Sequence, residues 1–136
     1  RVDIKAQVIE PGGADWQALD RAAGSVQALD EIRERHRRGE AVVLQMAGKA
    51  QGLAVIWCEI RQDGGRELVA GLGAGQGARA FIRWLIDFAR ANRATTIRTH
   101  CQRAGLIRLY QWAGFRIVGA DDSNFTILRW ADGRQQ

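Results

Sequence analysis

Four glycines alternate with other residues between positions 71 and 77, and this run is the part of the sequence best suited to chemistry. They are Gly71, Gly73, Gly75 and Gly77. Because glycine has no side chain, the backbone amides of such a turn can close around phosphate oxygens. A helical apolar stripe follows the run, and a helix N-terminus adds the positive end of its dipole. The sequence therefore predicts an anion site where this turn opens a helix.

Residues 73–78 also satisfy G-x-G-x-x-A, the fingerprint of dinucleotide-binding folds. That fingerprint requires an early parallel βαβ unit and an acidic residue about 20 positions later, which holds the ribose. Here three antiparallel strands are expected before the glycines, and the strand expected after them leads into His100 and Cys101. A dinucleotide is excluded on this context, and a turn that binds nothing stays as the alternative to an anion site.

Length and composition indicate the class of protein. A chain of 136 residues, 46% of them hydrophobic and five of them Trp, fits a single globular domain over residues 1–136. No apolar run approaches the roughly 20 residues of a membrane span, and no charged-then-apolar leader begins the sequence. These observations predict a soluble, cytoplasmic protein without a membrane partner.

The cysteine content and the net charge indicate which classes of ligand the protein could bind. Cys58 and Cys101 lie far apart and form no CxxC group, so neither a disulfide framework nor a metal site is predicted. The net charge of +5 comes mainly from arginine. Such a surface attracts polyanions, either nucleic acid or the phosphates of a cofactor. The arginines are spread along the whole chain, which favours compositional bias over a specific nucleic-acid site.

Hydrophobic periodicity predicts six elements before the glycines. Alternation indicates a strand at 4–9. Helical spacing indicates a short helix at 15–23 and a second helix from its cap Ser25 to Gly39, with acids early and bases late as the helix dipole favours. Apolar runs separated by turns predict three antiparallel strands, at 41–46, 53–60 and 67–70.

Two helices and three strands are expected after the glycines. The first helix carries an apolar stripe at Phe81, Leu85 and Phe88. Residues 95–99 are rich in β-branched side chains and return as a strand parallel to 67–70, which makes a βαβ unit. A second helix with Tyr110 on its apolar face ends at Gly114, and a hairpin follows at 115–118 and 124–130.

From residue 67 to residue 119 the chain resembles the Gcn5-related N-acetyltransferase (GNAT) superfamily, including divergent bacteriophage members. The family pattern is a strand, a turn Arg/Gln-x-x-Gly-x-Gly/Ala, a long helix, a strand, and a helix ending in Leu-Tyr-x-x-x-Gly-Phe. Residues 109–115 match that ending, and residues 75–77 match the Gly-x-Gly of the turn. The resemblance implies an α+β (α/β) fold with a mixed, mostly antiparallel sheet of six to seven strands, about four flanking helices, and 67–70 and 95–99 as its parallel pair.

The resemblance further implies acyl transfer from acetyl-CoA to a primary amine, without a metal. In the family the pantetheine lies between the two parallel strands and the pyrophosphate rests on amides of the turn. Tyr110 occupies the position that often protonates the departing sulfur, although it also suits a purely packing role. The residues implied to bind the cofactor are Leu72, Gly73, Ala74, Gly75, Gln76, Gly77 and Ala78. Arg103, near the start of the second helix, is a further candidate for the cofactor's phosphates, and it suits an acidic acceptor or a solvent-facing position equally.

Amide formation from an ammonium group also needs a base, a polarised thioester carbonyl and a donor for the thiolate. Two side chains are base candidates. One is Glu67, on the strand before the glycines, and the other is His100, a residue type that changes charge near neutrality. Glu67 also suits a solvated charge at a strand end, and His100 a hydrogen-bonded surface group. Water is a further candidate, since many family members rely on it.

The departures from the family pattern keep two other functions open. Leu72 stands where the family has Arg or Gln, and Arg103 where it usually has Asn. A binding module that keeps the fold without catalysis fits these departures, and an enzyme acting on nucleic-acid-linked amines fits the arginines. The expected partner is a small-molecule or protein amine, with nucleic acid as an alternative, and the expected assembly is a monomer or a homodimer.

Overall fold

The computed structural model describes residues 4–9 and 26–133, with the side chains of all but 26–29 and 72–74. The helix expected at 15–23 lies outside the described residues. The elements, in chain order, are β1 (Ile4–Ile9), α2 (Val26–Arg37), β2 (Val42–Gly48), β3 (Gln51–Ile60), β4 (Arg66–Gln76), α3 (Ala78–Ala91), β5 (Thr96–Cys101), α4 (Ala104–Trp112), β6 (Arg116–Ala120) and β7 (Thr126–Ala131).

The described strands form one seven-stranded sheet in the order β1-β2-β3-β4-β5-β7-β6. β4 and β5 are parallel, and every other neighbouring pair is antiparallel. Parallel neighbours need a crossover, which α3 supplies. The expected mixed, mostly antiparallel sheet is therefore confirmed, and so is the parallel pair of 67–70 with 95–99.

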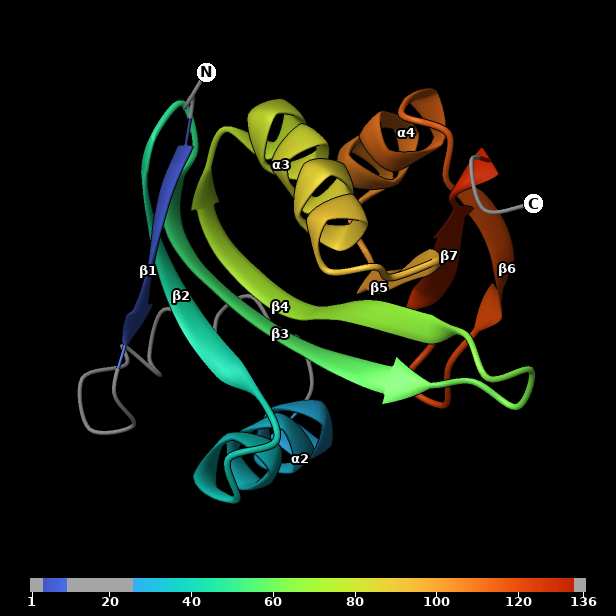
Figure 1. The fold of residues 1–136 in the computed structure, drawn as a ribbon, viewed down its shortest axis with the longest axis horizontal. Helices are drawn as coiled ribbons and strands as arrows, with labels where there is room; N and C mark the ends of the chain where they lie inside the picture. Colours follow the sequence, from blue (N-terminus) through green and yellow to red (C-terminus); the bar gives the residue numbers. More distant parts are fainter. Residues whose placement is uncertain (1–3, 10–25, 134–136) are drawn as a thin grey trace.

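Helices α3 and α4 cover one face of the sheet, and α2 lies on the other (Figure 1). The main core lies under α3 and α4, where Leu68, Ile97 and Leu128 of the strands pack with Ile82 and Leu85 of α3. Burying each such side chain stabilises the fold by about 1.5–3 kcal/mol. Alternation along the strands then turns their intervening residues toward the α2 face.

The glycine-rich segment differs from the expected turn. β4 extends to Gln76, so Gly71, Gly73 and Gly75 lie within the strand, and only Gly77 separates it from α3. The reason is non-local, because residues 72–76 pair with residues 51–55 of β3, and this ladder takes up the backbone groups that face β3. The predicted turn at 71–77 is wrong in extent, while the helix after it is correct.

Candidate active site

The parallel strands β4 and β5 diverge at the centre of the sheet. Their pairing ends at Ala70 opposite Thr99, after which β4 continues along β3 and β5 continues along β7. A β-bulge causes the bend, because Ala70 and Leu72 pair with consecutive residues of β3 and Gly71 is extra. In the described sheet, the edge of β4 after Ala70 therefore has no strand beside it on the β5 side.

Glycine is required where β4 passes into α3. A side chain at Gly75 would collide with the backbone oxygen of Gln51, and one at Gly77 with that of Lys49. Gly77 also has φ +86°, a left-handed conformation that favours glycine. Gly77 is the N-cap of α3 and is exposed, and α3 has no side-chain cap. The first N–H groups of α3 therefore remain available to an anion.

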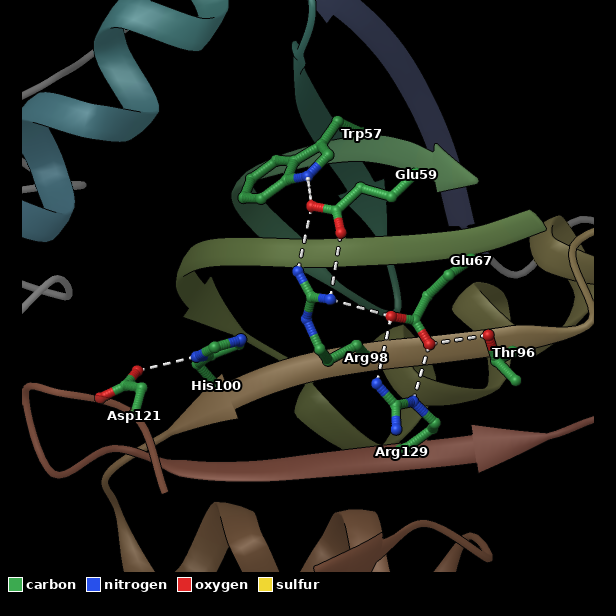
Figure 2. A network of polar contacts seen from close by, with 8 residues as sticks. All are labelled: Trp57, Glu59, Glu67, Thr96, Arg98, His100, Asp121 and Arg129. Atoms are coloured by element: carbon green, nitrogen blue, oxygen red, sulfur yellow. Dashed lines mark hydrogen bonds and ion pairs between the residues drawn. The ribbon is translucent and has the colours of Figure 1, made fainter. Parts of the chain in front are cut away.

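A polar network crosses four strands on the α2 face beside this divergence (Figure 2). Glu67, only 1% exposed, lies at its centre. Arg129 Nε donates to Glu67 Oε2 at 2.7 Å, Thr96 Oγ1 donates to the same oxygen at 2.7 Å, and Arg98 Nη1 donates to Oε1 at 2.9 Å. Arg98 also donates to Glu59 from both terminal nitrogens, at 3.1 Å each. Both oxygens of Glu67 are thus occupied.

These contacts determine the protonation of Glu67. Burial by itself would raise the pKa of Glu67, but hydrogen bonds from Arg129 and Thr96, with the charges of Arg129 and Arg98, outweigh burial and lower that pKa. The carboxylate is therefore ionised and surrounded by donors. Such a group is a weak proton acceptor near neutrality, which bears directly on Glu67 as a candidate base.

His100 occupies the position where β5 leaves β4. Its Nδ1 lies 2.7 Å from Asp121 Oδ2, and each of the two side chains is 27% exposed. Asp121 belongs to the turn between β6 and β7, far from His100 in sequence. Burial would raise the pKa of Asp121, but the hydrogen bond with His100 and the amides of Phe125 and Ser123 lower it. His100 therefore faces an ionised carboxylate.

Tyr110 approaches the same point of β5 from the opposite face. It lies in the core under α4, 4% exposed, with its ring edge-on to Phe115 at 4.8 Å between centroids. Burial raises the pKa of Tyr110 to about 12, although a hydrogen bond with Thr99 lowers it in part. Thr99 in turn donates to the carbonyl of Ala70 at 3.2 Å. Tyr110 thus keeps its proton beside the last paired residues of β4 and β5.

The structure brings part of the predicted set together. His100 lies at the end of β5 on the face that carries Arg98 (Figure 2), and Tyr110, hydrogen-bonded to Thr99, lies in the core on the other face. Gly75 and Gly77 lie at the end of β4. Arg103 is the N-cap of α4 and is exposed. Sequence reasoning missed Arg98, Arg129 and Asp121. Only the cross-strand register identifies them, since no motif contains them and they lie 21 to 62 residues from their partners.

Residues 4–9 and 26–133 contain neither a group of metal ligands nor a membrane-spanning helix. In these ranges no three His, Cys, Asp or Glu side chains gather as they would around a metal ion. Cys58 and Cys101 are both free thiols. No helix in the part of the chain that the structure describes is long and apolar enough to cross a membrane.

Comparison with known proteins identifies the fold. No protein-family model matches the sequence, and no curated protein matches it significantly. A GNAT family acetyltransferase from Elizabethkingia anophelis with acetyl-CoA bound aligns over 97% of this chain and 100% of its own, with a TM-score of 0.68 and 14% identity. A Bacillus subtilis acetyltransferase in complex with CoA aligns over 95% and 99%, with a TM-score of 0.64 and 18% identity. The AtaT–AtaR complex bound to DNA aligns over 93% of each chain, with a TM-score of 0.52 and 12% identity. This chain has the GNAT acetyltransferase fold.

Proposed function

We propose that this protein is an N-acyltransferase that moves an acetyl group from acetyl-CoA to a primary amine. The observation that carries the proposal is the divergence of β4 from β5 at Ala70 and Thr99, directly before the open N-terminus of α3. Solved structures with this fold hold acetyl-CoA or CoA. The cofactor here is a co-substrate, and the proposal involves no metal.

In this proposal, different parts of the chain contact the pantetheine arm and the pyrophosphate of acetyl-CoA. The pantetheine arm fits along the β4 edge after Ala70, where amides and carbonyls have no neighbouring strand on the β5 side. The pyrophosphate fits over the amides that follow Gly77, where the helix dipole favours negative charge. Of the set 72–78, we assign the pyrophosphate to the end nearest α3, since residues 72–76 form the strand. Arg103, exposed at the start of α4, remains a candidate phosphate partner.

The reaction then requires the chain to hold the amine next to the thioester and to assist proton transfer. The amine nitrogen forms a bond to the thioester carbonyl carbon, the carbon–sulfur bond breaks, and the sulfur leaves with the electron pair. Tyr110 retains its proton to a pKa of about 12 and can donate a hydrogen bond to that sulfur once the arm lies against β5. Its burial agrees with its packing role as well, so both functions of Tyr110 are compatible.

The experiment combines calorimetry with acetyl-CoA and a thiol-release assay over a panel of primary amines. We expect binding with a Kd in the micromolar range or tighter, and amine-dependent release of CoA. No binding at high micromolar acetyl-CoA contradicts the proposal. Binding without thiol release on any amine, including nucleic-acid-linked amines, indicates a non-catalytic module.

Gly77→Ala tests the assigned pyrophosphate contact. The new methyl group would lie 2.7 Å from Ala50 Cα, so the start of α3 must shift. We expect at least a tenfold weaker Kd for acetyl-CoA, because phosphate contacts depend on amide placement. Gly64→Ala is the matched control, since Gly64 shares φ +86° with Gly77 but has no atom within 4 Å of an added Cβ. Equal Kd values for the two variants would contradict the assignment.

A further inference from the structure

His100 and Asp121 form a hydrogen-bonded pair where β4 and β5 diverge. The carboxylate of Asp121 is fixed by its own turn, because Oδ1 accepts hydrogen bonds from the amides of Ser123 at 2.9 Å and Phe125 at 3.0 Å. The backbone of Asp121 exchanges a further bond with Phe125 at 2.9 Å. This leaves Oδ2 directed at His100 Nδ1, 2.7 Å away.

This contact determines which nitrogen of His100 can accept a proton. Because Asp121 is ionised and can only accept, Nδ1 carries hydrogen and donates it to Oδ2. The neutral imidazole then has its lone pair on Nε2. In Figure 2 the two ring nitrogens of His100 lie at opposite ends, one toward Asp121 and the other turned away from it over the sheet face that carries Arg98.

The other base candidate has no comparable free atom. Each oxygen of Glu67 accepts from Arg129, Thr96 or Arg98, and the side chain is 2% exposed. A proton placed on Glu67 would replace a contact with a guanidinium. His100, in contrast, is 27% exposed and offers one ring nitrogen.

We infer that His100 accepts the proton of the acceptor amine through Nε2, and that Asp121 is the positioning residue that fixes the Nδ1–H tautomer and ring orientation. The inference rests on the acyl transfer proposed above. The ammonium R–NH3+ gives one proton to Nε2, and its nitrogen bonds to the carbonyl carbon as the carbon–sulfur bond breaks. The amide nitrogen releases a second proton, the thiolate takes up one, and imidazolium returns its own to water.

The side of approach follows from this arrangement. His100 lies on the same sheet face as Arg98 and Glu67, and this is the face on which α2 lies. The acceptor amine must therefore reach Nε2 from the α2 face. Tyr110 lies on the opposite face, under α4, so proton acceptance and sulfur departure are separated by the strand itself.

Three variants test the pair. Asp121→Asn keeps an oxygen for the amides of Ser123 and Phe125 but presents N–H to His100, so the imidazole must move its hydrogen to Nε2. We expect H100Q and D121N each to lower kcat by about 10²–10⁴-fold with an unchanged Kd for acetyl-CoA. Asp122→Asn is the control, since it removes the same charge from the adjacent, exposed position.

Nitrogen NMR measures which ring nitrogen of His100 carries hydrogen. A role of Asp121 in stability alone would not change that tautomer. The chain has only two histidines, so spectra of H100Q assign the signals of His100. Wild-type protein and D122N should show hydrogen on Nδ1, and D121N on Nε2. An active wild type whose D121N variant matches D122N in kcat, or keeps Nδ1–H, overturns the inference and leaves the acyltransferase proposal intact. A wild type that binds no acetyl-CoA or releases no thiol overturns both.

Discussion

At the scale of single residues, the placement of Glu67 resolves two like-charge contacts at once. Glu59 lies directly opposite Glu67 in the register, and Arg98 lies directly opposite Arg129. Like charges so placed repel across neighbouring strands. Arg98 bridges the two acids and Glu67 bridges the two arginines, so each pair neutralises the other. The four charges are stable only as a set.

Glu67→Gln should therefore destabilise the fold. We expect it to lower the free energy of unfolding at pH 7 by about 2–3 kcal/mol, below the roughly 3–5 kcal/mol for opening a fully buried pair, because Arg98 and Arg129 retain some solvent contact. Urea unfolding measures the change. Glu31→Gln, an exposed acid on α2, controls for the loss of one carboxylate. Equal effects of the two substitutions would show that the network adds no stability.

The stability difference between the wild type and E67Q should depend on pH. The folded-state pKa of Glu67 lies below its ordinary value of 4.5. A group of this kind adds its full stability above the ordinary value, and that stability is lost as the pH falls through the lower folded-state value. We expect the unfolding free energies of wild type and E67Q to converge between about pH 5 and pH 2. A constant difference across that range would contradict the assignment.

At the scale of elements, the bend in β4 depends on a contact between β3 and β4. A Cβ at Gly71 would lie 2.6 Å from Trp57 Cη2 and closer still to Cζ3, so the indole covers the bulged residue. Trp57 is itself held from two sides, by its donation to Glu59 Oε2 at 2.8 Å and by the Arg35 guanidinium 4.7 Å from its ring centroid. The indole thus couples α2, the bulge and the polar network.

Gly71→Ala is expected to cost about 1–3 kcal/mol of stability, because the indole must move from a packed position. The backbone of Gly71 has no positive φ, so the cost comes from this contact. In a Trp57→Ala background the same substitution should cost at least 1 kcal/mol less, a coupling measured by a double-mutant cycle of urea unfolding. Gly119→Ala, in strand β6 with nothing within 4 Å, is the control and should be near neutral. Additive effects would contradict the coupling.

At the scale of the whole molecule, local sequence patterns predict the strands of the sheet but not the full set of residues in the candidate site. Alternation and β-branching located strands such as 4–9 and 53–60, and the Leu-Tyr-x-x-x-Gly-Phe motif located α4, because these signals are local. The sequence predicts a turn for the glycine segment, because a short window of sequence carries no information about its pairing with residues 51–55 of β3. His100 was predicted as a candidate base, but Asp121 was not, since a turn 21 residues away supplies it.

The net positive charge of the molecule could favour either of two anionic ligands, acetyl-CoA or DNA, and their effects on stability distinguish them. Several arginines make contacts within the molecule. Arg98 and Arg129 contact the buried Glu67, and on the surface Arg37 contacts Glu34 and Arg79 contacts the Trp112 ring. The net charge is +5, and the arginines are spread along the whole chain. Acetyl-CoA at 100 times its Kd should raise the unfolding free energy by about 2.7 kcal/mol. A DNA duplex should give a much smaller rise, measured by urea unfolding at two salt concentrations. A larger rise with DNA that falls steeply with salt would favour a nucleic-acid acceptor instead, because phosphate contacts release counterions.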